Sequence, residues 1–326
     1  VTDKVSEVFP DVENNVSKAL AIMKSSTRPD ISPRHAEQRH MKDWLKIFLN
    51  LHLDSDPYSI YRLSGPKRDL LGELEDQGYE LMKDVPNDFE GLHKKHQRQI
   101  ELMRIGDPVI QKEKIREFLE PIKYPLYFLD YETTAGVVPL VDGMRPWQQL
   151  PIQYSIHVQN EPGAELIHKE FIHTEKSNPS EKLIDQLQQD IGTDGTILVW
   201  YEPFEKGRNI ELGLVLPEQM DFVKEVNERV VDLMIPFKKG WYEDYRFRGS
   251  SSIKAVLPVL IPELSYEDLE VQDGLTAQRL WTETIFLGKN QADKDKLLDD
   301  LLAYCKLDTL AMVEIFSKLN DIVFHR

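Results

Sequence analysis

The stretch LYFLDYET, residues 126–133, decides the fold. It begins as a short apolar run and ends in two acids, Asp130 and Glu132. A short apolar run that follows turn signals, here Pro121 and Pro125, is typical of a buried strand. Side chains two apart on a strand point to the same face. We therefore expect the two carboxylates to lie side by side at the end of a strand.

Two neighbouring carboxylates repel each other and are costly to bury. Burial therefore requires a positive partner for Asp130 and Glu132. A divalent cation is the simplest such partner, because hard cations prefer carboxylate oxygens. The alternative is a solvated acid pair at a strand end, which needs no ligand.

The chain around this stretch, residues 121–326, alternates strand and helix patterns. The further strands that we expect are Ile152–Val158, Leu166–His173, Thr196–Tyr201 and Val230–Leu233. The expected helices are Ser180–Ile191, Phe204–Leu214, Ser251–Leu257, Thr276–Phe286 and Ala292–Ile322. Strands followed by helices that pack on a mixed sheet indicate an α/β layer fold.

Residues 1–120 are polar and mostly helical in pattern. The expected helices are Asn14–Lys24, Arg34–Leu51, Lys67–Gly78 and Gly91–Met103. The sequence thus predicts a smaller helical accessory region at 1–120, which would position a substrate or a partner, and a second domain at 121–326.

The long C-terminal helix carries an acid within an apolar stripe. Leu301, Tyr304, Asp308, Ala311 and Ile315 recur every three or four residues and so share one helix face. A lone buried carboxylate needs a partner. That partner is either a bound cation or, alternatively, a nearby arginine or backbone amide.

A further acid, Glu205, follows the strand expected at Thr196–Tyr201. Ligands of open α/β sheets gather at the carboxyl ends of strands. The alternative is an acid in the first turn of a helix, favoured by the helix dipole. Glu202 competes for the same role but precedes a proline and is expected in the loop.

The order Asp-x-Glu, a later acid and a final Tyr-x-x-x-Asp resembles the DEDD family of 3′–5′ exonucleases, in its DEDDy branch. More narrowly, the chain resembles the bacterial family DUF2779 over about residues 57–320. The segments that carry this likeness are YFLDYET (127–133), DGMRPWQQ (142–149), PIQYS (151–155), FEK (204–206), SIKAVLP (252–258) and YCKLDTLAM (304–312).

This resemblance implies an RNase H-like (DnaQ-like exonuclease) α/β fold and a metal-dependent 3′–5′ exonuclease acting on single-stranded DNA or RNA. Two Mg²⁺ or Mn²⁺ ions would be held by Asp130, Glu132, Glu205 and Asp308. Two such ions can activate a water and stabilise the leaving oxygen. Tyr304 would orient or deprotonate that water; because a free tyrosine titrates near ~10, orientation is the expected role unless the metals lower its pKa.

The chain departs from the family pattern at two places. Glu205 stands where the pattern usually has Asp, and Tyr201 stands near the place of a polar Asn. The alternative function is therefore a catalytically degenerate RNase H-like module that binds nucleic acid or protein. Relatives often carry an upstream nuclease module with clustered cysteines. No such cysteines are present in this sequence, so that activity is not expected here. Such a module, or a protein partner bound through residues 1–120, is the partner that we expect besides the substrate.

Five residues have weaker claims to a role in the site. Asp232 would lie behind the metal ligands or simply end a strand, and Lys254 would contact a phosphate or only balance surface charge. Arg145, Trp147 and Gln148 follow the first strand in a loop. An arginine for phosphate and a tryptophan for base stacking suit a single-stranded end; a packed hairpin loop is the alternative.

Composition limits the remaining possibilities. There are 40 Lys and Arg against 56 Asp and Glu, a net charge of −16, which argues against a broad duplex-binding surface. The single cysteine, Cys305, excludes a disulfide framework and a multi-cysteine metal site. A reducing, cytoplasmic location is expected. No apolar run approaches the ~18 residues of a membrane span, and no signal peptide is apparent.

Overall fold

The computed structural model of the protein describes residues 2–27 and 29–324. Residues 1, 28, 325 and 326, which include the outer ends of the two predicted regions, lie outside the described residues. The chain divides into two compact units, Val1–Arg104 and Ile105–Arg326. The division therefore falls after residue 104, whereas the sequence places it near residue 120.

The earlier division has a physical reason in helix α5 (Lys112–Leu119), which the sequence analysis did not predict. Its apolar side chains Ile115 and Leu119 are buried in the same core as Met312 and Phe316 of helix α12 (Lys294–Phe324). Residues 105–120 thus contribute to the hydrophobic core of the second unit.

The first unit is helical, as predicted. Its helices are α1 (Thr2–Lys24), α2 (Met41–Leu51), α3 (Arg68–Asp76) and α4 (Lys94–Ile105). The prediction of a single helix at Arg34–Leu51 is wrong for its first residues, because α2 begins only at Met41. Two short 3₁₀ turns, Pro33–His35 and Gln38–His40, precede α2 there. Arg34 pairs with Glu75 and Asp76 of α3, which holds this segment against α3 instead of extending α2.

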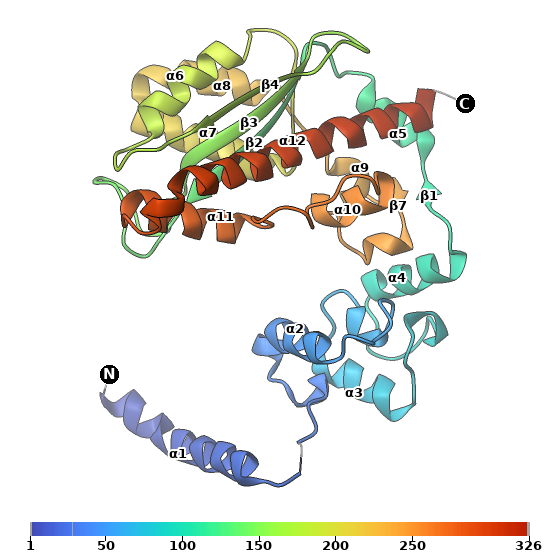
Figure 1. The fold of residues 1–326 in the computed structure, drawn as a ribbon. Coiled ribbons are helices and arrows are strands. Elements are labelled where there is room, and N and C mark those ends of the chain that lie inside the picture. The colour runs from blue at the N-terminus through green and yellow to red at the C-terminus, as the bar shows by residue number, and fades with distance from the viewer. Residues whose placement is uncertain (1, 28, 325–326) are drawn as a thin grey trace. The chain divides into compact units, whose positions relative to one another are not determined.

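The second unit is built on a mixed sheet, as predicted. Its strands are β2 (Leu126–Thr134), β3 (Leu150–Gln159), β4 (Ile167–Ile172), β5 (Thr196–Val199) and β6 (Val230–Asp232). They lie in the order β4-β3-β2-β5-β6. Figure 1 shows β4, β3 and β2 side by side. β3 runs antiparallel to β2 and β4, whereas β5 is parallel to both β2 and β6.

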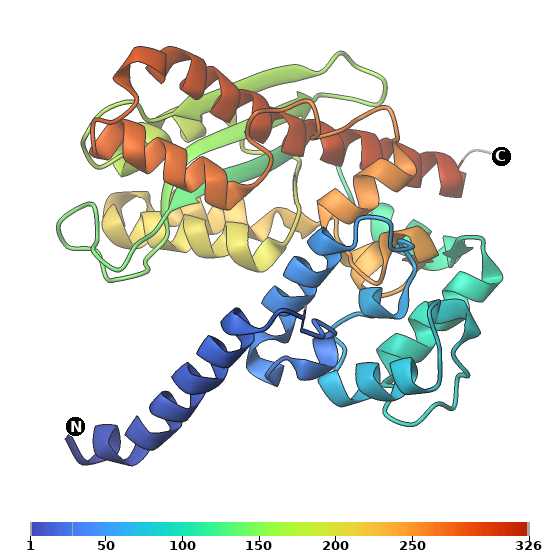
Figure 2. The same ribbon diagram turned by 60° about the horizontal axis from the view of Figure 1, so that its bottom comes forward.

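Helices cover both faces of this sheet (Figures 1 and 2). One layer contains α10 (Ile253–Leu260), α11 (Gly274–Trp281) and α12; the other contains α6 (Ser180–Asp190), α7 (Glu202–Val215) and α8 (Met220–Glu228). A short π-helix, Thr282–Phe286, continues α11. The short strands β1 (Val109–Ile110) and β7 (Tyr242–Glu243) pair antiparallel in a separate two-stranded sheet, and the short helix α9 (Ile235–Lys238) precedes β7.

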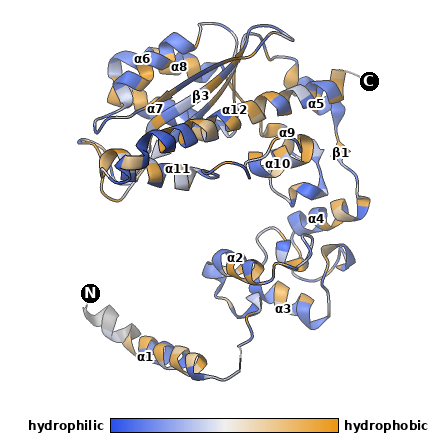
Figure 3. Cartoon of the chain, viewed as in Figure 1, coloured by the Kyte–Doolittle hydropathy of each residue, from blue (hydrophilic) through white to orange (hydrophobic). Residues whose placement is uncertain are grey.

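The alternation of side chains along β2 directs the acids to one layer. Leu126 and Phe128 are buried with apolar residues of α12, whereas Tyr127 and Leu129 are buried with α6. Because strand side chains alternate with a period of two, Asp130 continues the face of Leu126 and Phe128. In Figure 3, hydrophobic and hydrophilic residues alternate along α12, as expected for a helix that packs one side on a sheet.

The expected strands and helices of the second unit are present, with shifted ends. β5 stops at Val199, because α7 begins at Glu202 and not near Phe204. Glu202 is therefore a helix residue paired with Lys206, which corrects its expected place in a loop. The sequence patterns did not predict helix α8. No helix among residues 2–27 and 29–324 has the length and apolar character to cross a bilayer.

Candidate metal centre

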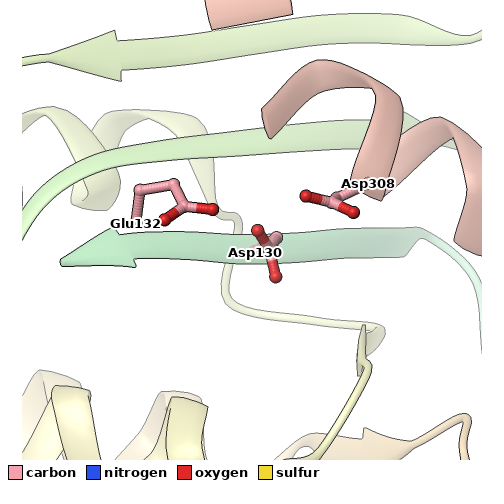
Figure 4. A group of neighbouring side chains, drawn as sticks. All are labelled: Asp130, Glu132 and Asp308. Atoms are coloured by element: carbon pink, nitrogen blue, oxygen red, sulfur yellow. The ribbon is translucent and has the colours of Figure 1, made fainter. Parts of the chain in front are cut away.

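Three acids from two elements converge on the α12 side of the sheet. Asp130 and Glu132 come from β2, and Asp308 comes from α12 (Figure 4). One carboxylate oxygen from each lies within 4.8 Å of the others. Asp308 is 6% exposed and Glu132 9% exposed. The structure thus brings together the strand pair and the helix acid, which the family resemblance implied to share a metal site.

Glu205 belongs to the same site. It lies in the first turn of α7, is 2% exposed, and its Oε2 has no hydrogen-bond partner among the described residues. It lines a cavity of about 310 Å³ together with Asp130, Glu132 and Asp308. An unpaired buried carboxylate oxygen is unfavourable. The buried position of Glu205 therefore suits its carboxylate as an oxygen ligand of a cation.

Burial and mutual repulsion disfavour the ionised state of these acids. Burial raises the pKa of Asp130, Glu132 and Glu205 well above the usual carboxyl range, and the charges of neighbouring acids raise it further. Burial also raises the pKa of Asp308, to about 6, although hydrogen bonds from Tyr266 and Tyr304 oppose this shift. A bound cation would relieve both effects.

A lysine and two tyrosines surround Asp308. Lys254 Nζ donates to the Tyr304 hydroxyl at 3.0 Å and to the carbonyl of Gln272 at 2.7 Å. The Tyr266 hydroxyl donates to Asp308 Oδ1 at 2.6 Å. The ammonium of Lys254 also lies 4.9 Å and 5.3 Å from the ring centroids of Tyr304 and Tyr266. These contacts fix the carboxylate and place one positive charge beside the acids.

Tyr304 is held as a neutral phenol. Burial raises its pKa strongly, and the charges of Asp308, Glu132 and Asp130 raise it further. Since a phenol with a raised pKa keeps its proton at neutral pH, Tyr304 is suited to orient a water by hydrogen bonding and unsuited to act as a general base.

The residues present fit hard divalent cations. The four acids offer oxygen ligands alone, which suit Mg²⁺ or Mn²⁺. Cys305 lies beside them, with Sγ 3.6 Å from Asp130 Oδ2, but burial and the nearby acids raise its thiol pKa. It therefore remains a thiol that donates a weak hydrogen bond to Asp130. Tyr266 and Cys305 orient the carboxylates that would bind the ions.

Lys254 and Asp232 had weaker predicted roles. Lys254 lines the cavity, but Asp232 is absent from the described lining. Asp232 Oδ1 instead accepts the backbone N–H of Tyr201 at 3.1 Å and of Met234 at 3.0 Å. It thereby holds the segment between β5 and α7 in place.

The loop between β2 and β3 does not bring its predicted residues to the cavity as the structure describes it. Arg145 Nη2 lies 3.6 Å from Glu211 Oε1 of α7. Gln148 Oε1 accepts the backbone N–H of Arg145 at 3.0 Å. Trp147 is 66% exposed. The loop thus bonds to itself and to α7, and the substrate contacts expected of it stay predictions.

Sequence reasoning missed several residues of the site. Tyr266 stands in the connection between α10 and α11, where no periodic pattern marks it. Trp200, Tyr201 and Phe204 also line the cavity. Since they directly follow strand β5, the rule that places ligands at the carboxyl ends of strands could have found them.

Comparisons with known proteins place the chain near one family. Residues 127–252 match a family described as "Domain of unknown function (DUF2779)". This range contains Asp130, Glu132 and Glu205 and ends before Lys254 and Asp308.

Two curated proteins are similar to the chain. "Uncharacterized protein MG366" of Mycoplasma genitalium is 24% identical over 230 residues, which are 64% of this chain and 34% of that protein. The "Uncharacterized protein MG366 homolog" of Mycoplasma pneumoniae is 25% identical over 229 residues, with the same coverage. The chain thus spans about a third of the length of these relatives. No solved structure matches it significantly.

Proposed function

We propose that this chain is a metal-dependent 3′–5′ exonuclease with an RNase H-like fold that hydrolyses phosphodiester bonds of single-stranded DNA or RNA. The observation that carries the proposal is the convergence of Asp130, Glu132 and Asp308 within 4.8 Å, beside the unpartnered oxygen of Glu205. The mixed sheet with helices on both faces is consistent with such a fold, as are the acids in the second half of β2 and in the first turn of the helix that follows β5.

The contacts in the site suggest a separate role for each of its residues. Asp130, Glu132, Glu205 and Asp308 would hold two Mg²⁺ or Mn²⁺ ions, which supply an activated water and stabilise the leaving oxygen. Tyr304 orients the water through its protonated hydroxyl. Lys254, whose ammonium lines the cavity, attracts the phosphate of the substrate. Tyr266 keeps the Asp308 carboxylate in position.

The cavity supports a single-stranded substrate. It measures about 310 Å³ and is bordered by the aromatic residues Trp200, Tyr201 and Phe204. A chain with a net charge of −16 lacks the basic excess typical of duplex binders, whereas a narrow aromatic cavity accepts an unpaired terminal nucleotide. A cytoplasmic location, and a partner that binds through the helical N-terminal region, remain part of this proposal.

The test is a gel assay with 5′-labelled single-stranded DNA and RNA in Mn²⁺, Mg²⁺ or EDTA. We expect a ladder that shortens from the 3′ end, requires metal, and slows about a thousandfold in Asp308→Asn, since metal charge supplies several kcal/mol of transition-state stabilisation. Asp299→Asn, on the exposed side of the same helix, is the matched control. Equal activity of Asp308→Asn and wild type would rule out the proposed site.

A second candidate is a non-catalytic RNase H-like binding module. Lys254 favours it, because its ammonium already places one positive charge beside the acids. Calorimetry separates the two. Mn²⁺ binding that is lost in Glu132→Gln supports the enzyme, whereas a protein that binds oligonucleotides but no Mn²⁺ supports the module.

A further inference from the structure

Tyr201 adopts an unusual backbone conformation at the cavity. Its φ is 93° and its ψ is 72°, in the left-handed region, between the end of β5 and the start of α7. A bulky residue there is a genuine outlier, because its Cβ is crowded by the backbone. Such strain persists only where the surrounding structure enforces it, and it is concentrated at functional sites.

Asp232 anchors the backbone at Tyr201. Its carboxylate is 3% exposed, and Oδ1 accepts the N–H groups of both Tyr201 and Met234. The Tyr201 carbonyl in turn accepts the N–H of Phe204 at 3.0 Å, which starts α7. The buried carboxylate therefore fixes the direction in which the Tyr201 side chain leaves the backbone.

The ring of Tyr201 stays available at the mouth of the cavity. The residue is 47% exposed. The neighbouring Trp200 is engaged, since it stacks on Phe237 at 5.6 Å and donates to the Ser251 carbonyl at 3.2 Å. Among the residues that the structure describes, no aromatic ring stacks on Tyr201.

A cation lies next to this ring. Lys238 Nζ is 5.4 Å from the Tyr201 ring centroid. Within residues 29–324 no carboxylate forms an ion pair with Lys238. An exposed ring beside an unpaired ammonium suits a nucleotide, which offers a flat base and an anionic phosphate.

From this geometry we infer that Tyr201 is a substrate-specificity residue on which a terminal, unpaired nucleobase stacks, with Lys238 attracting the adjacent phosphate and Asp232 acting as the positioning residue. The inference rests on the proposed function, and it names the part of the substrate that the cavity mouth selects. Stacking favours an unpaired end, because a paired base cannot lay its face on the ring.

The test measures binding in Ca²⁺ by fluorescence anisotropy. It compares a 5′-labelled single-stranded oligonucleotide with one whose 3′-terminal nucleotide is abasic. We expect wild type and Tyr201→Phe to bind the complete end about tenfold more tightly, and Tyr201→Asn to lose this difference. Asn tolerates the left-handed backbone, so the fold is expected to survive the change. The circular dichroism and melting curve of Tyr201→Asn check this.

Trp147→Asn is the matched control. Trp147 is also an exposed aromatic residue with positive φ, at 61°, but it is outside the described cavity lining. We expect this variant to keep the tenfold difference. Retention of the difference in Tyr201→Asn, or its loss in Trp147→Asn, overturns the inference.

Two further outcomes also overturn it: equal binding of both oligonucleotides by wild type, and no binding of either. Hydrolysis in Mn²⁺ is scored separately. Selective binding without hydrolysis contradicts the exonuclease and leaves the stacking role standing. Hydrolysis without a difference between the two ends contradicts only the stacking role.

Discussion

At the scale of single residues, the site buries four carboxyl groups, and burial disfavours their ionised state. Four acids stand close together, one of them with a buried oxygen that lacks a partner among the described residues. The compensating contacts come from Lys254, Tyr266, Tyr304 and Cys305. These contacts are too few to neutralise four negative charges, so the acids either keep protons or bind cations.

A variant without the Tyr266 hydroxyl tests how much the hydrogen bond to Asp308 contributes to metal affinity. Tyr266→Phe removes the hydrogen bond to Asp308 and keeps the ring. We expect Mn²⁺ affinity to fall about tenfold, the size typical for the loss of a residue that orients a metal ligand. Calorimetric titration measures it. Tyr79→Phe, in the first unit, is the control, and an unchanged affinity in Tyr266→Phe would show that Asp308 needs no such support.

The raised pKa values predict a stability that depends on pH. The unfolded acids ionise near pH 4, whereas Asp308 in the folded state ionises near pH 6 and the other three at values well above their usual range. The metal-free protein therefore loses stability as the pH rises from about 4 through 6. The Asp308 shift alone corresponds to at most about 3 kcal/mol.

Mn²⁺ is expected to reverse this loss. Because the ion binds the ionised acids, it should raise the melting temperature strongly at pH 7.5 and little at pH 5. Melting curves with Mn²⁺ and with EDTA at both pH values measure the effect. A Mn²⁺-induced shift of equal size at pH 5 and pH 7.5 would contradict the burial of ionisable ligands described above.

At the scale of elements, the site depends on how α12 packs on β2. Asp130 and Glu132 are placed by the two-residue period of a strand, and Asp308 by the period of a helix. Neither period states where the two elements cross. The apolar stripe of α12, which buries Leu301, Ala311 and Ile315, brings Asp308 to the strand acids.

Ile315→Ala tests this dependence. Ile315 is fully buried on α12, two turns beyond Asp308. We expect the free energy of unfolding to fall by about 2–5 kcal/mol, through lost burial and a residual cavity. Urea denaturation measures it, with the exposed Lys318→Ala of the same helix as the control. A loss below about 0.5 kcal/mol would mean that α12 is not anchored by this stripe.

At the scale of the whole molecule, the chain consists of two units that divide after Arg104. Helix α5 supplies the physical reason, since Ile115 and Leu119 are part of the core that holds α12. The net charge of −16 is a property of the whole chain. The net charge affects the solubility of the protein and its non-specific binding to charged molecules. Cations bound at the acids would instead change the electrostatic potential at the site.

Two truncations distinguish the structural division from the one suggested by the sequence. We expect residues 105–326 to unfold cooperatively and to keep Mn²⁺ binding. Residues 121–326 should be much less stable, because they lack the two buried side chains of α5, each worth roughly 1.5–3 kcal/mol. Thermal and urea unfolding compare them. Equal stability of the two fragments would show that α5 adds nothing to the core.

By itself, the sequence determined the features that depend on local periodicity. These are the strand that carries Asp130 and Glu132, although it continues to Thr134, the acid within the apolar stripe of the last helix, and the helical character of the N-terminal region. Such features follow from the repeat of one element and need no knowledge of its neighbours. The mixed α/β sheet followed from the order of these elements.

Only the tertiary structure decided which residues from different elements meet. It brought Tyr266 and Lys254 to Asp308, left Glu205 with an unpartnered oxygen, and kept Arg145, Trp147 and Gln148 out of the described cavity lining. These are loop residues or residues far apart in the chain, so their places depend on packing and on hydrogen bonds that no periodic pattern encodes. The left-handed backbone of Tyr201 also depends on a contact between elements, because its N–H donates to the buried carboxylate of Asp232 on β6.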